Sequence, residues 1–247
     1  MPKYKQGLAF RYMQGTKYHR DRPLSDDLGS IQAPERFKNY PDAERLQLPE
    51  PDLSRPADLW QCLARRRSER DTTPELLSIG ELANLMWAAQ GVTARAGIHL
   101  LRTAPSAGAL YPFETYLYID KVEEVPQGIY HFDVADFALE RLQSGNFNRE
   151  FTAAALGQPV VQRAAVVIIW TAMMLRCMVK YRDRAMRYIP MDLGHVCQNV
   201  QLAAPAMGLG SCPIGAFFDD DLNELIGVDG EEETVVYLIT VGKLRGH

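Results

Sequence analysis

A basic cluster, Arg65-Arg66-Arg67-Ser68-Glu69-Arg70, is the first stretch whose residue types could do chemistry. An arginine guanidinium is a planar fork that can hold two oxygens of a phosphate monoester at once. Cations also gather at the solvated C-terminal ends of helices, where they interact favourably with the helix dipole. By itself the cluster is therefore compatible with a phosphate site or with a helix end, and the helix end is the commoner case.

Two other stretches contain few large side chains. Residues 103–112 have the sequence Thr-Ala-Pro-Ser-Ala-Gly-Ala-Leu-Tyr-Pro, and residues 208–215 have the sequence Gly-Leu-Gly-Ser-Cys-Pro-Ile-Gly. Glycine and alanine allow close approach, either of another backbone or of a planar aromatic cofactor. We expect both stretches to be loops. Their composition does not decide whether the close approach serves another backbone or a cofactor. A basic tail, Gly242-Lys243-Leu244-Arg245, follows the last predicted strand.

Several common chemistries lack sequence support. The chain contains no Gly-x-Gly-x-x-Gly after a strand, no Walker-type loop, no His-Glu-x-x-His and no Gly-x-Ser-x-Gly. Its four cysteines are scattered, without a Cys-x-x-Cys pair or a histidine at zinc-ligand spacing, so we expect reduced structural thiols and no metal. These absences disfavour dinucleotide-fold, phosphate-loop, zincin and common hydrolase chemistry.

Length and composition are those of an ordinary globular protein. The chain has 247 residues, 47% hydrophobic and 23% charged, and its formal charge of −4 gives no reason to expect a nucleic-acid partner. The N-terminus lacks the apolar segment of a secretory signal, and no apolar run is long enough to cross a bilayer. We therefore expect a cytoplasmic protein without a membrane partner.

Helices and strands are predicted in mixed order, which favours an α+β fold over a doubly wound one. Residues 165–170, Ala-Val-Val-Ile-Ile-Trp, predict a central strand buried on both faces. Residues 1–55 contain six prolines, at 2, 23, 34, 41, 49 and 51, and few sustained apolar periods. We expect them to form an N-terminal leader that packs on a main domain at residues 56–247. Further strands are expected at 113–119, 128–132, 137–142 and 234–241.

Apolar spacing and capping residues place the helices. Residues 57–66 should form one, with Leu59, Trp60 and Leu63 on one face. Ser78 should cap another, because Glu81 follows at capping-box spacing, and Gly91 should end it. The pattern turns helical again after residue 173, and Pro205 should kink or end that segment. Short helices are expected at 148–156 and 219–226.

In this order and at these separations, residues 66–70, 105–112 and 208–215 resemble the FMN-dependent nitroreductase superfamily. Within it, Pro105-Ser-Ala-Gly-Ala-Leu-Tyr-Pro112 and Lys180-Tyr-Arg-Asp-Arg-Ala-Met-Arg-Tyr188 are similar to the SagB-type branch, the thiazole- and oxazole-forming dehydrogenases. The likeness covers about residues 56–245. The resemblance implies a nitroreductase-like α+β fold, with a mixed or antiparallel sheet flanked by helices, and a homodimer that binds FMN at the subunit interface.

The resemblance also implies roles for individual residues. Arg66, Arg67 and Ser68 would hold the FMN phosphate and ribityl chain, and Arg70 would lie at the pyrimidine edge, where reduced flavin carries negative charge. The amide of Gly215, beside Ile214, would face flavin N5. Two basic residues of the tail, Lys243 and Arg245, would close over the phosphate. A loop of the partner subunit would line the flavin with Pro105, Ser106, Ala107, Gly108 and Leu110.

Lys180 and Tyr181 match a Lys-Tyr pair that the branch uses for proton handling. Oxidation of an azoline to an azole removes a hydride and a proton, so a base is needed near the flavin. A solvated basic helix end with Tyr181 packed inward explains the pair equally well. Asp192, His195 and Asn199 share one helix face, and there we favour a satisfied polar stripe at the dimer contact over catalysis.

The expected function is two-electron transfer, as a hydride, between flavin N5 and a small or peptide-borne substrate. Because no cyclodehydratase domain is recognisable in the chain, a different small substrate stays open. One alternative is an NAD(P)H-dependent reductase of nitro or quinone compounds. An alternative of another class is a flavin-binding module without turnover.

Overall fold

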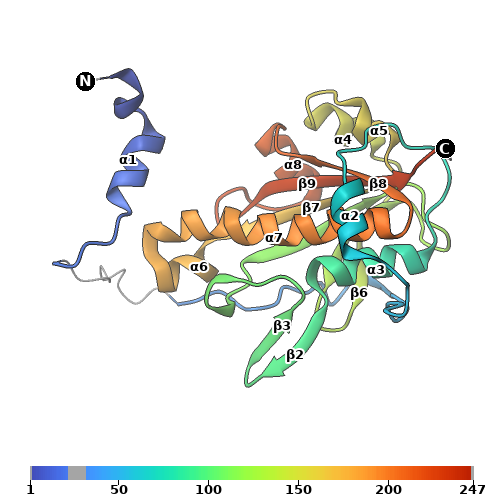
Figure 1. The fold of residues 1–247 in the computed structure, drawn as a ribbon, viewed down its shortest axis with the longest axis horizontal. Coiled ribbons are helices and arrows are strands. Elements are labelled where there is room, and N and C mark those ends of the chain that lie inside the picture. The colour runs from blue at the N-terminus through green and yellow to red at the C-terminus, as the bar shows by residue number, and fades with distance from the viewer. Residues whose placement is uncertain (1, 22–31, 246–247) are drawn as a thin grey trace.

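The computed structural model describes residues 2–21 and 32–245. Within them, the main sheet has the strand order β1-β6-β5-β4-β7-β9-β8, and each neighbouring pair is antiparallel (Figure 1). The predicted α+β fold is confirmed. The strands are β1 Glu44–Gln47, β4 Phe113–Ile119, β5 Gly128–Asp133, β6 Ala138–Ser144, β7 Val166–Met173, β8 Leu209–Ile214 and β9 Glu233–Lys243.

Helices cover both faces of the sheet. Helices α3 and α7 pack on one face with the larger apolar core, and α4, α5 and α8 pack on the other with a second core. A small separate hairpin consists of β2 Val92–Ala96 and β3 His99–Arg102. The helices are α1 Leu8–Gly15, α2 Leu59–Arg65, α3 Ile79–Gln90, α4 Asn148–Ala154, α5 Pro159–Arg163, α6 Met174–Tyr181, α7 Ala185–Ala206 and α8 Asp219–Ile226, with single 3-10 turns η1 Lys3–Gln6, η2 Ala107–Ala109 and η3 Arg182–Arg184.

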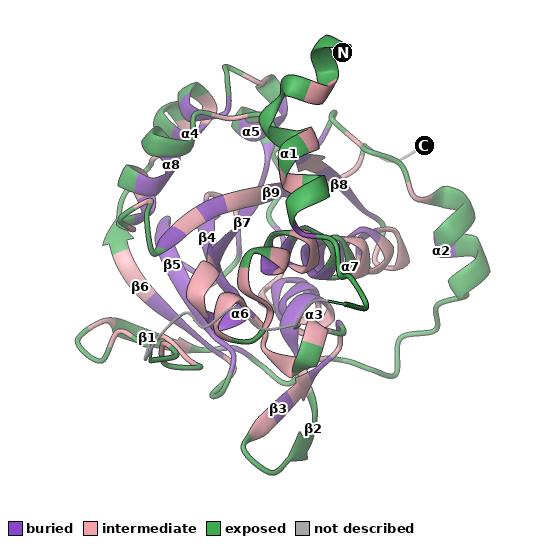
Figure 2. Cartoon of the chain, turned by 90° about the vertical axis from the view of Figure 1, so that its left-hand side faces the viewer, coloured by how far each residue is buried: buried purple, intermediate pink, exposed green. Residues whose placement is uncertain are grey.

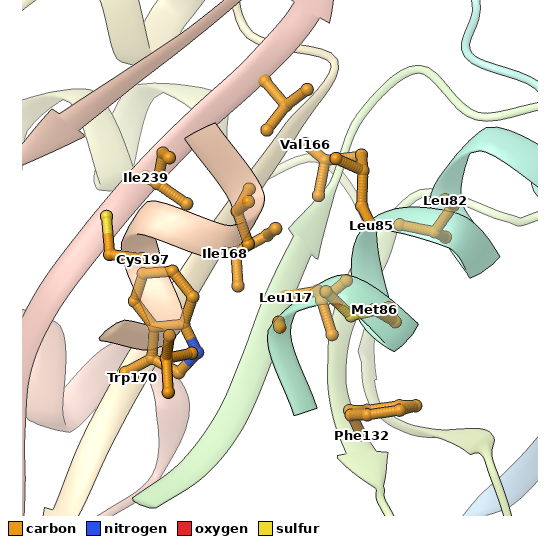
Figure 3. Packing of buried hydrophobic residues seen from close by; sticks show 14 of the residues in the cluster. Leu82, Leu85, Met86, Leu117, Phe132, Val166, Ile168, Trp170, Cys197 and Ile239 are labelled. Atoms are coloured by element: carbon orange, nitrogen blue, oxygen red, sulfur yellow. The ribbon is translucent and has the colours of Figure 1, made fainter. Parts of the chain in front are cut away.

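The predicted central strand is confirmed as β7, which lies between β4 and β9. Its residues from Val166 to Ala172 are buried, as expected for a β-branched run that faces a core on each side. Figure 3 shows Ile168 and Trp170 among side chains of α3 and α7, including Met86 and Cys197. This packing fixes the ends of β4 and β7, from which the candidate site is built.

Helix α3 begins as predicted. The Ser78 hydroxyl accepts a hydrogen bond from the Glu81 amide at 3.1 Å, and the Glu81 carboxylate accepts one from the Ser78 amide at 2.8 Å. This reciprocal pair satisfies two amides that the first helical turn leaves without partners. Helix α7 ends at Ala206, directly after Pro205, as expected from the missing proline amide.

One prediction was wrong, and one predicted helix leaves its apolar face exposed. Most of the expected loop at 208–215 forms edge strand β8, because β9 supplies a complete partner ladder from Leu209 to Ile214. Pro213 is tolerated there because an edge strand does not need every amide in the ladder. The apolar face of α2 is not core: Leu59, Trp60 and Leu63 are 55%, 76% and 43% exposed (Figure 2).

The N-terminal region contributes regular structure that its composition did not predict. Strand β1 pairs with β6, and Lys38 forms an ion pair with Glu233 of β9 at 2.6 Å. Helix α1 stands away from the sheet and is largely exposed (Figures 1 and 2). The predicted boundary near residue 55, between an N-terminal leader and a main domain, stays a prediction. No helix of the described residues is long and apolar enough to span a bilayer.

Candidate active site

The loop at residues 105–112 is tied to helix α7 by one carboxylate. Asp192 accepts hydrogen bonds from the Ser106 hydroxyl at 2.7 Å and from the Ala107 amide at 2.8 Å. The same hydroxyl accepts a bond from the Tyr111 amide at 3.0 Å, which closes the loop on itself. The predicted polar stripe thus contains an anchor for the loop at residues 105–112, a role that helical spacing alone could not assign to Asp192.

The loop backbone is strained. Gly108, Ala109 and Tyr111 have φ of 64°, 54° and 45°. Side-chain-bearing residues rarely adopt this left-handed region, and each such residue costs free energy that the surroundings must offset. Small residues keep this cost low, so the composition of the loop serves its shape as well as any ligand.

Lys180 and Tyr181, at the end of α6, lie directly over this loop. A Cβ atom placed on Gly108 would be 2.6 Å from Lys180 Nζ and 2.7 Å from Tyr181 Oη. Any side chain at position 108 would therefore displace this pair. The structure brings together two motifs about 70 residues apart, and we call residues 105–112 with Lys180 and Tyr181 the Lys180 subsite.

The arginine cluster lies along the edge of β8. Ser68 forms an isolated parallel bridge with Ser211, and the Glu69 amide donates to the Ser211 carbonyl at 2.9 Å. Within the described residues, the guanidiniums of Arg67 and Arg70 donate to backbone carbonyls of the cluster and of Ala64, and form no ion pair with a carboxylate. Their charges are uncompensated by acids, as a phosphate site requires.

The basic tail is divided between two places. Lys243 donates to Glu81 at 2.5 Å, so its ammonium is already paired at the start of α3. Burial would raise the pKa of Glu81, but the hydrogen bonds from Lys243 and Ser78 and the charge of Lys243 together outweigh it, so that the pKa is lowered. Arg245 instead lines a cavity of about 310 Å³ with Lys121 and Arg163.

The glycines of β8 serve different purposes. A Cβ on Gly210 would lie 2.6 Å from Leu244 and 3.0 Å from Glu69, so close packing of the arginine segment requires glycine there. Gly215 is exposed and has ordinary room, with Tyr237 at 3.5 Å from a built Cβ, while Ile214 is buried. Gly215, directly after β8, is thus open to a ligand.

The two halves of the candidate site lie apart in one chain. The loop is fixed at Asp192, and α2, which leads into the arginine cluster, packs near the other end of α7 (Figure 1). From Asp192 to Ala206 is 14 residues, a helical rise of about 21 Å. The arginine cluster and the Lys180 subsite therefore do not form one compact pocket within a single chain.

A second polar cluster, the buried ladder, crosses β4, β5 and β6. His131 contacts Glu140 through Nδ1 at 2.8 Å and Glu114 through Nε2 at 3.1 Å, and Arg176 of α6 contacts Glu114 at 2.6 Å. Burial alone would lower the pKa of His131 and raise that of Glu114, but their hydrogen bond and the other partners outweigh burial in both cases. The pKa of His131 is therefore raised and that of Glu114 is lowered.

The fold is that of the nitroreductases. Residues 63–243 match the Nitroreductase family, and the chain belongs to this family of oxidoreductases. The chain is 35% identical to a Methanocaldococcus jannaschii protein named as a nitroreductase, over 82% of this chain and 98% of that protein.

Two further relatives extend the comparison. A crystal structure from Anabaena variabilis, also named as a nitroreductase, superposes with a TM-score of 0.75 at 28% identity, over 96% of this chain and 47% of that one. The trifolitoxin-processing protein of Rhizobium leguminosarum bv. trifolii is 30% identical over 61% of this chain. The match spans only 42% of that protein's length.

Proposed function

We propose that this protein is an FMN-dependent dehydrogenase of the SagB type, which oxidises a small or peptide-borne substrate by two electrons. The observation that carries the proposal is the position of Lys180 and Tyr181 against Gly108. This position brings the loop of residues 105–112, which would line the flavin, next to the Lys-Tyr pair that the sequence suggested for proton transfer. Similarity to a trifolitoxin-processing protein supports a peptide-borne substrate.

The residues of the site fit FMN chemically. Arg66, Arg67 and Ser68 would hold its phosphate and ribityl chain, with Arg70 at the pyrimidine edge and Gly215 at N5, because the cluster offers cations without acidic partners. Arg245 remains a candidate for the phosphate. Lys243 would first have to leave Glu81, which makes it the weaker of the two tail residues.

A homodimer would complete the site. Since the arginine cluster and the Lys180 subsite lie apart along α7, one half of each flavin site must come from the partner subunit. The exposed apolar face of α2, formed by Leu59, Trp60 and Leu63, supports this arrangement because an apolar helix face gains free energy when a second subunit covers it. This is why the loop of residues 105–112 is assigned to the partner's flavin.

FMN, when bound, supplies the two-electron acceptor at N5. The chain itself must remove the proton that leaves with the hydride when an azoline becomes an azole. Lys180 in its neutral form can accept that proton, and Tyr181, whose hydroxyl is next to it over Gly108, can donate a hydrogen bond to the substrate heteroatom. The loop has no bulky side chain at Gly108, and it would hold the substrate between Lys180, Tyr181 and the flavin.

The first experiment is the absorption spectrum of the purified protein, followed by release and identification of its flavin. We expect one FMN per subunit, and a colourless protein that stays so after incubation with FMN would contradict the proposal. The flavin should then be reduced anaerobically by a thiazoline-containing peptide or small thiazoline. Lys180→Met and Tyr181→Phe should slow this step with little loss of FMN.

An NAD(P)H-dependent reductase is the second candidate, favoured by the relative named as a nitroreductase. Anaerobic mixing with NAD(P)H separates the two. Rapid bleaching of the flavin by NAD(P)H, together with no reduction by thiazolines, would select the reductase and reject the dehydrogenase. Failure of every donor and acceptor with a fully FMN-loaded protein would leave only a flavin-binding module.

A further inference from the structure

The turn that follows Lys180 and Tyr181 is strained. Arg182, which joins α6 to η3, has φ 54° and ψ −144°. This region of backbone space is populated almost entirely by glycine, because a Cβ atom crowds the neighbouring peptide. Its Nε is buried without a hydrogen-bond partner among the described residues. Such a conformation persists only where surrounding contacts hold it.

The N-terminal arm, residues 12–18, supplies contacts on the residues directly after this turn. Arg187 donates to the Met13 carbonyl at 2.6 Å and to the Thr16 hydroxyl at 2.8 Å. Arg184 donates to the Thr16 carbonyl at 2.6 Å. The two arginines thereby satisfy carbonyls at the C-terminal end of α1, a favourable place for cations.

Further contacts of the arm reach the residues on the C-terminal side of the turn. The Tyr12 hydroxyl donates to the Asp183 carbonyl at 3.3 Å, and Thr16 is buried although most of its neighbours in the arm are exposed. The Arg184 guanidinium lies 4.1 Å from the ring centre of Tyr18 and donates to the Tyr188 hydroxyl at 2.8 Å.

This chain of contacts ends at the Lys180 subsite. The ring of Tyr188 packs edge-on against that of Tyr181, with ring centres 4.8 Å apart. Tyr181 in turn touches the position above Gly108. Residues far from the flavin loop in sequence are thus connected to it through Arg184 and Tyr188.

We propose that the N-terminal arm is a brace that holds the strained turn at Arg182 and thereby keeps Lys180 and Tyr181 over the flavin loop. Thr16, Arg184 and Arg187 are positioning residues, since they act through the turn and not on the substrate. The claim that Lys180 and Tyr181 matter for catalysis rests on the proposed function. The claim that the arm holds the turn rests only on the hydrogen bonds of Thr16, Arg184 and Arg187 and on the backbone of Arg182.

The test uses the full-length chain and three substitutions that remove the arginine contacts of the brace, Thr16→Val with Arg184→Met and Arg187→Met. Amide hydrogen exchange over residues 176–188 should become about tenfold faster or more, because the turn opens locally, while exchange in β4 and β7 stays unchanged. Arg11→Met is the matched control, because it removes an exposed cation of α1 that has no described contact with residues 182–188. Unchanged exchange in the brace variant would overturn the proposal.

A rescue experiment separates bracing from ordinary packing. Arg182→Gly removes the strain, so in the brace variant it should return exchange of residues 176–188 toward the unsubstituted rate, and alone it should raise Tm by about 2–4 °C. Arg182→Ala removes the same side chain but keeps the Cβ atom, and should give neither effect. Equal behaviour of the two variants would overturn the role of strain.

These measurements need no flavin and no substrate. If the protein binds no FMN, the proposed function fails while the exchange results still decide whether the arm braces the turn. If FMN binds, loss of the brace should lower the rate of flavin reduction by a thiazoline without a matching loss of FMN affinity, and the Arg182→Gly substitution should restore that rate.

Discussion

The Lys180 subsite and the buried ladder both contain ionisable side chains, but they differ in how completely those side chains are paired. In the ladder, His131 lies between two carboxylates and Arg176 adds a second cation, all of them buried. In the subsite, Lys180 is exposed and lies over a strained backbone. A densely paired buried cluster is typical of a structural network, whereas an exposed lysine at a strained loop is typical of a reactive site.

The comparison shows why shifted pKa values alone do not identify the site. Burial would raise the pKa values of Glu114 and Glu140, but the hydrogen bonds from His131 together with their other partners, including Arg176 and Arg45, outweigh it, so that both values are lowered. The carboxylates of the ladder are paired within the protein, and among the described residues only Nη1 of Arg176 is a ladder atom buried without a hydrogen-bond partner. The ladder instead fixes the start of α6 through Arg176, so that Lys180 is held at the other end of the same helix.

Breaking the ladder should have the largest effect on stability. Glu114→Gln keeps the shape of the side chain but leaves Arg176 and His131 as buried cations with one carboxylate fewer. Removing one partner of a buried ion pair costs about 3–5 kcal/mol, and we expect a loss of that size in the free energy of unfolding. Urea unfolding followed by circular dichroism measures it, and a loss below about 1 kcal/mol would show that the ladder is not structural.

A bulky residue at Gly108 should affect function more than stability. Gly108→Leu forces Lys180 and Tyr181 away and strains the backbone at φ 64°, so turnover and FMN retention should be lost while the fold remains. The stability cost should be about 1–3 kcal/mol. Gly97→Leu is the control, because Gly97 has φ 58° but open space around it, and it should show the strain alone. A yellow, active Gly108→Leu protein would refute the assignment of the loop.

The smallest expected effect is a dependence of stability on pH. Because the pKa of His131 is raised by its two carboxylates, its contribution is complete below the unfolded pKa of about 6.5 and is lost as pH rises through the higher folded pKa. Unfolding free energy should therefore fall between neutral and alkaline pH by at most about 1.4 kcal/mol per pH unit. Glu114→Gln should flatten this slope. A stability that rises over this range would contradict a charged His131.

Local sequence signals predicted much of the fold. The Ser78 capping box, the apolar run that became β7, and the helix from Asp219 to Ile226 all depend on neighbours within a few residues, so sequence spacing alone revealed them. Strand β8 was missed because its identity depends on the edge of β9, which no local pattern contains. The exposure of the apolar face of α2 could not be foreseen, because amphipathic spacing does not say whether the same chain or another covers that face.

For the candidate site, the sequence by itself determined which residue types are present and in what order: an arginine cluster, a loop of small residues and a Lys-Tyr pair. Only the tertiary structure decided that the pair lies against Gly108, that Asp192 anchors the loop, and that Arg184 and Arg187 hold the N-terminal arm. The physical reason is distance along the chain. These contacts join residues that are 70 to 174 positions apart, where close packing and strain, and not local propensity, select the partners.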